Sequence, residues 1–240
     1  MIASAIDKIL SLAKPAVVQI GDEMYGVDKL TRLDTERHAE PLHVRTLSSM
    51  VLYIREFNDM RKDLPLLVQV VSPTKVQLVT ALDKDRKREC LMVAEAELPI
   101  IPFHEFIDNE KMLIAVQSMF VEDAETDRAL VLKFAGTVTS GSVKEYGDDG
   151  VTQKATIQNG VASKATAIVP SPCKLTPFRT FLEVEQPTSE FIFRMKEGRD
   201  NTVLSALFEA DGGAWKNEAV DNIRCYLEKA LEGTGVIVIS

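Results

Sequence analysis

The C-terminal part of the chain constrains the fold most strongly, because it holds the clearest helix pattern of the sequence and, directly after it, an apolar run that needs a partner strand. After a turn signal at 211–213, apolar residues recur at i, i+3, i+7 and i+11 from Val220 to Leu231, and Gly233 stops the helix. The run VIVI at 236–239 is an aggregation-prone edge if it stays unpaired. We therefore expect a long helix followed by a strand inside a sheet.

Antiparallel strands are predicted in the middle of the chain as well. Three apolar segments between residues 66 and 97 are separated by a turn signal at 72–74 and by the charged run 83–89. This pattern is typical of a three-stranded meander with the charged run at a hairpin tip. Tight-turn signals at 148–150 and 158–160 flank a segment whose side chains alternate with period two. An alternating segment and a strand that we expect to pair with it lie at 191–195 and 204–209.

Helical spacing predicts the remaining elements. Residues 2–13 carry an apolar stripe that must pack either on the domain or on a neighbouring subunit, and Pro15 closes this helix. Thr46 is placed to cap a helix over Leu47–Phe57. Further helices are expected to begin near Phe103 and to lie around 113–120 and 130–134.

These patterns together predict an α+β fold: mainly antiparallel sheets with an N-terminal helix, central helices and a long C-terminal helix followed by a terminal strand. No repeat and no clear linker divides the sequence, so we expect one compact unit over residues 1–240. Within it, residues 1–137 are expected to form a mixed region of helix and meander. Residues 138–240 are expected to form an antiparallel sheet plus the C-terminal helix and strand.

Charge and cysteine content exclude several classes of protein. The 28 basic and 36 acidic residues give a net charge of −8, which disfavours a dedicated nucleic-acid binder but allows a local basic patch. Cys90, Cys173 and Cys225 form no CxxC pair, so neither a disulfide framework nor a zinc site is expected. No apolar stretch approaches about 18 residues, and the N-terminus lacks the basic region of a secretory signal. We therefore expect a cytoplasmic protein with no membrane partner.

Standard catalytic and phosphate-binding motifs are missing from the sequence, among them GxxxxGK[ST], GxGxxG and GxSxG. His38 and His43 are a weak candidate for a metal site, but solvated loop side chains explain them better. The acidic run that starts at Asp123 mimics a calcium loop, yet Arg128 stands where such a loop needs glycine. We therefore expect no cofactor, no metal and no enzymatic activity. In a carboxylate-dependent hydrolase, the first residues to test would be Asp83, Asp85, Asp148 and Asp149.

The charged run 83–89 is the most informative polar feature, because its net charge is +1 in an acidic protein. One interpretation is a tip that contacts phosphate, nucleic acid or an acidic partner. The other, which the mixed signs favour, is a solvated hairpin tip with its own ion pairs. The candidate binding residues are Lys84, Arg86, Lys87 and Arg88.

Six segments carry a resemblance to a protein family: AEPLHVRTLSSMVLYI, TALDKDRKRE, LPIIPFHEFIDNEKM, DDGVTQKATIQNGVA, LTPFRTFLEVEQPTSEFIFRM and FEADGGAWKNEA. From about Pro41 onward, they are similar to phage and prophage proteins of low-GC Gram-positive hosts and, more distantly, to the YfdQ-like prophage proteins. The resemblance implies a viral or prophage origin and the cytoplasm of an infected bacterium. It implies no catalytic residues, because the family has no assigned mechanism.

The favoured functional hypothesis is a non-enzymatic, self-assembling phage or prophage accessory protein, a homo-oligomer that acts as a scaffold or binding platform. It is favoured because a neighbouring subunit can complete several apolar or small-residue segments. The alternative is an accessory factor of phage DNA recombination or replication that contacts nucleic acid through the charged run 83–89. A weaker alternative is a binder of host defence proteins or signalling nucleotides. The candidate residues of the oligomer interface are Ile2, Ile6, Ile9, Val236, Ile237, Val238 and Ile239.

Overall fold

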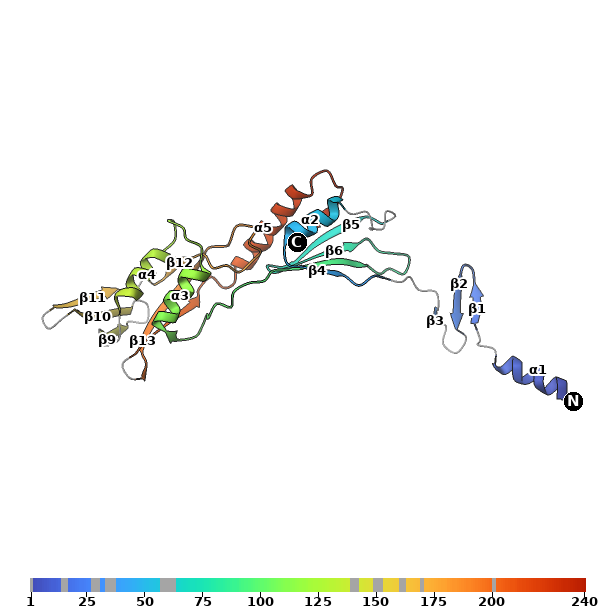
Figure 1. Ribbon diagram of the computed structural model, residues 1–240, viewed down its shortest axis with the longest axis horizontal. Coiled ribbons are helices and arrows are strands. Elements are labelled where there is room, and N and C mark those ends of the chain that lie inside the picture. The colour runs from blue at the N-terminus through green and yellow to red at the C-terminus, as the bar shows by residue number, and fades with distance from the viewer. Residues whose placement is uncertain are drawn as a thin grey trace.

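The computed structural model confirms the predicted α+β class, with mainly antiparallel sheets, a helix at the N-terminus and a C-terminal helix followed by a strand. The elements lie in a row along the molecule, and the N-terminal helix occupies one end of the row (Figure 1). No helix among the described residues is long and apolar enough to span a membrane. The described residues are 2–13, 17–26, 31–32, 38–56, 64–138, 143–148, 153–159, 163–168, 171–199 and 202–240.

A five-stranded sheet lies in the middle of the molecule (Figure 1). In spatial order, its strands are β15 (Ile237–Ile239), β5 (Leu66–Ser72), β6 (Lys75–Thr80), β7 (Cys90–Glu95) and β4 (Leu42–Val44). The meander predicted for 66–97 is confirmed, because β5, β6 and β7 are antiparallel neighbours. The outer strands β15 and β4 pair in parallel with β5 and β7. The terminal strand therefore lies in a sheet, as the sequence predicts.

Two helices pack on this sheet and on each other. They are α2 (Leu47–Glu56) and α5 (Trp215–Ala230). The predicted cap of α2 is confirmed, because the backbone N–H of Ser49 donates to Thr46 Oγ1 at 3.3 Å. The buried side chains between helices and sheet form the first core. Among its members are Leu47, Met50, Val68, Leu78, Ile223 and Leu227.

A four-stranded sheet with two further helices forms the second core. In spatial order, its strands are β12 (Cys173–Leu175), β13 (Ser189–Glu197), β14 (Val203–Glu209) and β8 (Ile107–Asp108), and its helices are α3 (Asn109–Met119) and α4 (Arg128–Thr137). The predicted pairing of 191–195 with 204–209 is confirmed, and Phe193 lies opposite Leu207. Because side chains alternate along β13, every second one is buried. Among the members of the second core are Met112, Val116, Phe134, Leu175, Phe191 and Phe193.

Two smaller sheets and the N-terminal helix complete the described elements. The sheets are β1 (Val17–Ile20), β2 (Glu23–Gly26) and β3 (Thr31–Arg32), and then β11 (Ser163–Ile168), β10 (Gln153–Asn159) and β9 (Val143–Asp148). The predicted N-terminal helix is confirmed as α1 (Ile2–Ala13). Five positions of the predicted caps and turns lie outside the described residues: Pro15, Phe57, Asp149, Gly150 and Gly160.

The prediction of a helix that begins near Phe103 is wrong. Phe103 makes an isolated bridge to Leu207, and His104 has a positive φ of 64°, which a right-handed helix does not contain. The apolar spacing of this segment reflects a loop that packs along β14, not a helix. Helix α3 begins later, where Asp108 caps its first turn.

Each of the two cores draws on both predicted sub-regions, 1–137 and 138–240. The chain builds the meander of the first core, continues into the second core after β7, and returns to the first through α5 and β15. The first core therefore includes residues from both the first half and the end of the chain. The single compact unit over residues 1–240 stays a prediction.

Candidate functional site

The charged run 83–89 lies between β6 and β7, as predicted, but it folds as a closed loop. The backbone N–H of Lys87 donates to Asp83 Oδ1 at 2.8 Å, and this bond holds the pKa of Asp83 below its usual value. His38 Nε2 lies 3.2 Å from the other carboxylate oxygen of Asp83. Glu89 is buried, and it accepts the backbone N–H of Ala39 at 2.7 Å. Two of the three carboxylates of the run therefore face inward.

The four candidate binding residues of this loop are exposed. Its outer surface is therefore more basic than the net charge of the run indicates. Arg86 has a positive φ of 59° at the turn. Arg88 Nη1 donates to the carbonyl oxygen of Thr80 at 3.0 Å, so this residue also holds the loop closed. The structure thus brings Lys84, Arg86, Lys87 and Arg88 onto one loop surface, with Asp85 half-buried beside them.

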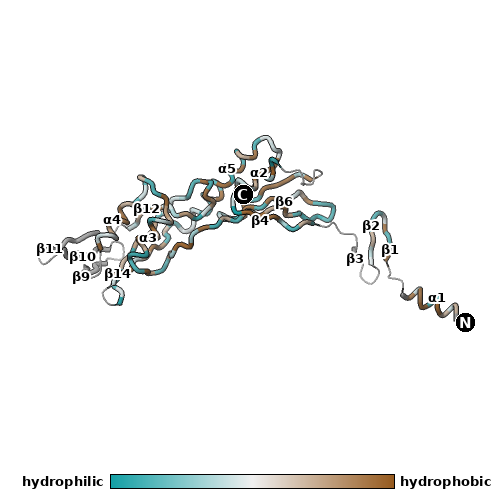
Figure 2. The backbone as a smooth tube through the Cα atoms, viewed as in Figure 1, coloured by the Kyte–Doolittle hydropathy of each residue, from teal (hydrophilic) through white to brown (hydrophobic). Residues whose placement is uncertain are grey.

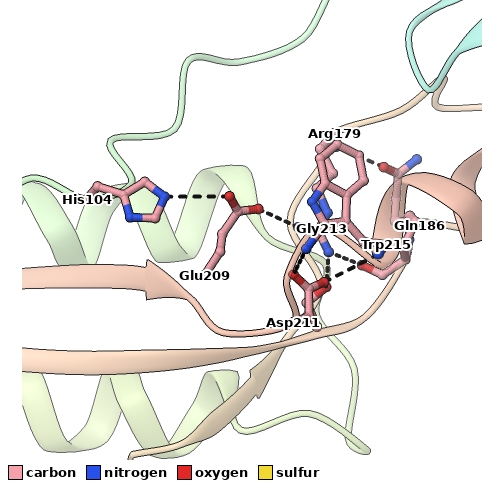
Figure 3. A network of polar contacts seen from close by, with 9 residues as sticks. His104, Arg179, Gln186, Glu209, Asp211, Gly213 and Trp215 are labelled. Carbon is pink, nitrogen blue, oxygen red and sulfur yellow. Dashed lines mark hydrogen bonds and ion pairs between the residues drawn. The ribbon is translucent and has the colours of Figure 1, made fainter.

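A buried arginine that the sequence reasoning missed forms the centre of a polar network (Figure 3). Arg179 is only 6% exposed. Its Nη1 donates to Glu209 Oε1 at 3.0 Å, and its Nη2 donates to Ser189 Oγ and to the carbonyl oxygen of Pro187. The guanidinium lies 4.1 Å from the ring centroid of Trp215. Burial lowers the pKa of Arg179 to about 10, so the side chain is still cationic at neutral pH.

Asp211 links this network to the start of α5. Ser189 Oγ donates to Asp211 Oδ2 at 2.6 Å, and the backbone N–H of Gly213 donates to Asp211 Oδ1 at 3.0 Å. The turn needs glycine at 213, whose φ is 84°. Burial by itself raises the pKa of Asp211, but these hydrogen bonds and one from the backbone N–H of Trp215 outweigh it and hold the pKa below its usual value.

The network belongs to a segment, residues 176–189, that joins the two cores and is named the strap here. On the side of the second core, Pro177 bridges to Phe120, and the backbone N–H of Phe178 donates to the carbonyl oxygen of Met119 at 2.9 Å. On the side of the first core, Phe181 is inserted among the buried side chains and is 1% exposed. Arg179 lies between these two contacts.

A glutamine and a threonine fix the path of the strap. Gln186 Oε1 accepts the backbone N–H groups of Arg179 and Thr180, at 3.0 and 3.2 Å. Thr180 Oγ1 donates to the carbonyl oxygen of Pro73, in the turn between β5 and β6, at 2.6 Å. Both contacts are buried or partly buried, where a lost hydrogen bond leaves an unsatisfied polar group. These hydrogen bonds therefore stabilise the observed path of the strap between the cores.

The Arg179 network has the chemistry of a structural junction. Ser189 donates its proton to Asp211 and not to His104, so a nucleophile–histidine relay is not formed. His104 lies at the other end, with Nε2 3.6 Å from Glu209 Oε2. The hydrogen bonds to Asp211 hold its pKa below the usual value, so this carboxylate is ionised at neutral pH and is not a general acid.

The candidate metal ligands His38 and His43 have different surroundings in the part of the chain that the structure describes. No group of three or more His, Cys, Asp or Glu side chains is arranged there to hold a metal ion. His38 contacts Asp83, while His43 is exposed on the edge strand β4. Cys173 is buried, and burial raises its pKa to about 12, which keeps it a protonated thiol.

A cavity of about 480 Å³ lies beside the first turn of α2. Glu183 Oε1 accepts both the backbone N–H and the hydroxyl of Ser48 there, each at 3.0 Å. Arg45 and Glu97 form an ion pair at its border. Each of these charged groups already has a partner within the chain.

The N-terminal segment 2–26, named the arm here, differs from the strap because its large apolar side chains are exposed. In α1, Ile6, Ile9, Leu10 and Leu12 are 50, 65, 57 and 75% exposed. Figure 2 shows hydrophobic residues recurring along this helix at the end of the molecule. The side chain of Ile2 lies outside the description. The arm therefore presents two of the predicted interface residues, Ile6 and Ile9, to solvent.

The C-terminal interface candidates divide between two environments. Val236 and Val238 pack against the first core. Ile237 and Ile239 are 61 and 41% exposed. Since β15 is an edge strand of its sheet, these two side chains lie at an edge of that sheet. The terminal segment therefore buries one set of its side chains within its own chain and exposes the other.

The sequence held one signal for the Arg179 network. Arg179 stands between apolar residues in the segment TPFRTF, and an arginine in such surroundings needs a buried partner. Its partners cannot be identified from spacing, because Glu209 and Asp211 follow in the chain only after a complete strand pair.

Comparison with known proteins identifies no relative. The chain matches no family model, and no curated protein sequence and no solved structure shows significant similarity to it. The resemblance of six segments to phage and prophage proteins therefore stays a prediction.

Proposed function

We propose that the protein is a non-enzymatic homo-oligomer, a self-assembling scaffold or binding platform whose subunits associate through the arm. The observation that carries the proposal is the apolar face of α1, on which four large side chains are each at least half exposed. Large exposed apolar surface marks an interaction site. The resemblance to phage and prophage proteins supports a setting in the cytoplasm of an infected bacterium.

The chemistry of α1 favours a protein partner over a lipid surface. Its polar face carries one acid and one base, Asp7 and Lys8. Helices that lie on anionic membranes have polar faces rich in Lys and Arg. A helix of 12 residues is also marginal in water on its own, so it needs tertiary or quaternary packing to persist.

The arm exposes enough apolar surface to drive association. Its hairpin adds Val17, Ile20 and Met24, which are 40, 55 and 45% exposed, to the four residues of α1. At about 1.5–3 kcal/mol for each fully buried side chain, complete burial of the exposed fractions is worth on the order of 5–10 kcal/mol per arm. The estimated cost of bringing subunits together is of similar size, about 4–15 kcal/mol.

The native mass, measured by size-exclusion chromatography with light scattering, tests the proposal. We expect a discrete multiple of the 26.6 kDa chain mass. The triple variant Ile6→Gln, Ile9→Gln, Leu10→Gln keeps good helix formers in α1 but removes its apolar face, and we expect it to elute as a monomer. A wild-type chain that is monomeric at micromolar concentration contradicts the proposal.

A matched control separates the arm from exposed apolar residues in general. Leu52, Ile114 and Leu130 are 57, 57 and 51% exposed on helices of the two cores. Their triple replacement by Gln is expected to leave the oligomer mass unchanged. If this control variant dissociates and the α1 variant does not, the interface lies on the cores and not on the arm.

A second candidate function, nucleic-acid binding through the loop 83–89, is favoured by the inward position of two of its carboxylates. Four exposed basic side chains remain on its surface. We expect fluorescence-labelled single- or double-stranded DNA to bind at low salt, and Arg86→Glu with Lys87→Glu to abolish binding. Arg88 is left intact because it holds the loop closed.

The control for this experiment is Lys111→Glu with Lys133→Glu, which makes the same change of charge at exposed helix positions. If both double variants lose binding equally, only the net charge matters and the loop is not the site. Absence of DNA binding by the wild-type protein removes this second function altogether.

A further inference from the structure

The spacing of apolar residues in α1 is that of a coiled-coil core. Ile2, Ile6, Ile9 and Ala13 follow one another at intervals of 4, 3 and 4 residues, so they occupy successive d, a, d and a positions of two heptads. Globular docking needs only a broad apolar stripe, whereas this regular alternation is what identical helices need to interlock.

The apolar face of α1 is wider than the seam of a two-stranded coiled coil. Leu10 and Leu12 occupy e and g positions, on either side of the a/d seam, and they are 57 and 75% exposed. A dimer covers the a/d seam and leaves these two side chains in water, whereas a bundle of three or more helices buries them. Isoleucine at both a and d positions also favours three or four strands over two.

The two charges of α1 define the direction of packing. Asp7 occupies a b position beside the e edge of the apolar face, and Lys8 occupies a c position beside the g edge. In a parallel ring the e edge of one helix faces the g edge of the next, which places Asp7 beside Lys8 of the neighbouring copy. In an antiparallel arrangement like edges meet, and each charge meets its own kind. Charge complementarity therefore favours the parallel arrangement.

We infer that the α1 helices of three or more copies of this chain pack as one parallel bundle, an inference that rests on the proposed self-assembly through the arm. Its place at the end of the molecule allows this, because β1–β3 separate α1 from both cores in Figure 1. The subunits are then joined at one end, and the two cores of each copy project from the bundle with their surfaces accessible.

Disulfide formation at a core position of the full-length protein tests the inference. Ile9→Cys is compared with Ser11→Cys, which lies at an f position on the outer face, both with Cys225→Ser to remove the exposed native thiol. In a parallel bundle, the thiols at residue 9 lie at the same level. We expect oxidation by diamide to yield covalent dimers at least about tenfold faster for Ile9→Cys, within an oligomer whose native mass corresponds to three or more chains.

Three outcomes separate this inference from the proposed function. A monomeric wild-type chain overturns both. An oligomer that the triple Gln variant dissociates, but in which Ile9→Cys and Ser11→Cys react equally slowly, keeps the proposed function and overturns the bundle, since α1 then docks on another part of the neighbouring chain. A native mass of two chains overturns the bundle as well.

Exchange of charge tests the direction of the helices. Asp7→Lys places a second lysine beside Lys8 of the next copy in a parallel ring, and we expect association to weaken by about two- to fivefold at each helix contact. The double exchange, Asp7→Lys with Lys8→Asp, restores opposite charges and is expected to restore association. In an antiparallel bundle like charges face each other in all three proteins, so equal association of the three overturns the parallel arrangement.

Discussion

The strap and the arm differ in which kinds of side chain they bury and which they expose. In the strap, residues 176–189, the polar side chains of Arg179 and Gln186 are buried and hydrogen-bonded, and Arg179 contacts groups on three different segments. In the arm, apolar side chains such as Ile9 and Leu12 are mostly exposed. Burying a polar group costs free energy unless it is hydrogen-bonded, so the strap depends on specific polar contacts. Burying an apolar group is favourable, and the exposed apolar side chains of the arm do not have this gain in the single chain.

The difference indicates which parts of the molecule are complete in one chain. The strap joins the two cores through contacts within one chain, and its buried Arg179 and Gln186 are hydrogen-bonded to groups of that chain. The arm contains helix α1, which lies away from both cores in Figure 1. An apolar face on a two-heptad helix is stable only when a partner covers it. We therefore regard the two cores as self-sufficient and the arm as the element through which copies meet.

The largest expected loss of stability comes from a substitution at the apolar contact of the strap. Phe181 is 1% exposed in the first core, and Phe181→Ala is expected to lower the free energy of unfolding by about 3–5 kcal/mol, because it leaves a cavity. Its neighbour Leu182 is 68% exposed, and Leu182→Ala is expected to change stability by less than about 0.5 kcal/mol. Urea unfolding followed by circular dichroism measures both. Equal values for the two variants would show that the strap does not depend on the first core.

The next largest loss of stability is expected from a substitution at the polar centre of the strap. Arg179→Met is expected to lower the free energy of unfolding by about 3 kcal/mol, because Glu209 and Asp211 then lose the cation with which both interact. The control is Arg224→Met, which removes an arginine that pairs with Asp221 and Glu228 on the exposed surface of α5. We expect that control to leave stability nearly unchanged. A stable Arg179→Met protein would mean that the buried pair is dispensable once an apolar side chain fills its place.

The sequence predicts the local elements of this fold and not the contacts between them. The cap at Thr46, the alternation along β13 and the Val220–Leu231 stripe of α5 each depend on neighbours within one segment, and all three are confirmed. The predicted helix near Phe103 is wrong because pairing with β14, a segment about a hundred residues away in the chain, outweighs local apolar spacing. The Arg179 network has the same origin, since it is assembled only by tertiary structure.

The charged loop shows the same division between local and long-range information. Its position between two strands and its four basic residues follow directly from the sequence. That Asp83 and Glu89 face inward does not, because their partners include His38 and Ala39 from a segment more than forty residues earlier. A sum of charges along a segment therefore differs from the charge that the folded loop presents.

A smaller effect concerns the pH dependence of the strap. The pKa of Asp211 is lower in the folded chain than its unfolded value of about 3.9. A lowered pKa stabilises the fold at pH above the unfolded value, and this contribution is lost as the pH falls through the folded value. Asp211→Asn is therefore expected to lower the free energy of unfolding by about 1 kcal/mol at pH 7, because hydrogen bonds to a charged acceptor are lost, and the difference from wild type is expected to shrink below about pH 4.

Urea unfolding at several pH values measures this difference, with Asp221→Asn on the exposed face of α5 as the matched control. The control is expected to show no such change with pH. A difference between wild type and Asp211→Asn that stays constant down to pH 3 would mean that the charge of Asp211 does not cause it.

The smallest expected effect concerns the arm, and it sharpens the comparison because it depends on protein concentration. At concentrations where the oligomer dissociates, the triple variant Ile6→Gln, Ile9→Gln, Leu10→Gln is expected to unfold within about 0.5 kcal/mol of wild type, because these side chains are already exposed in the single chain. Association stabilises only the native state, so the wild-type urea midpoint is expected to rise with protein concentration while the midpoint of the variant stays constant. A variant that is destabilised even at the lowest concentration would mean that α1 packs on its own chain, and the arm would then be part of the body that the strap holds together.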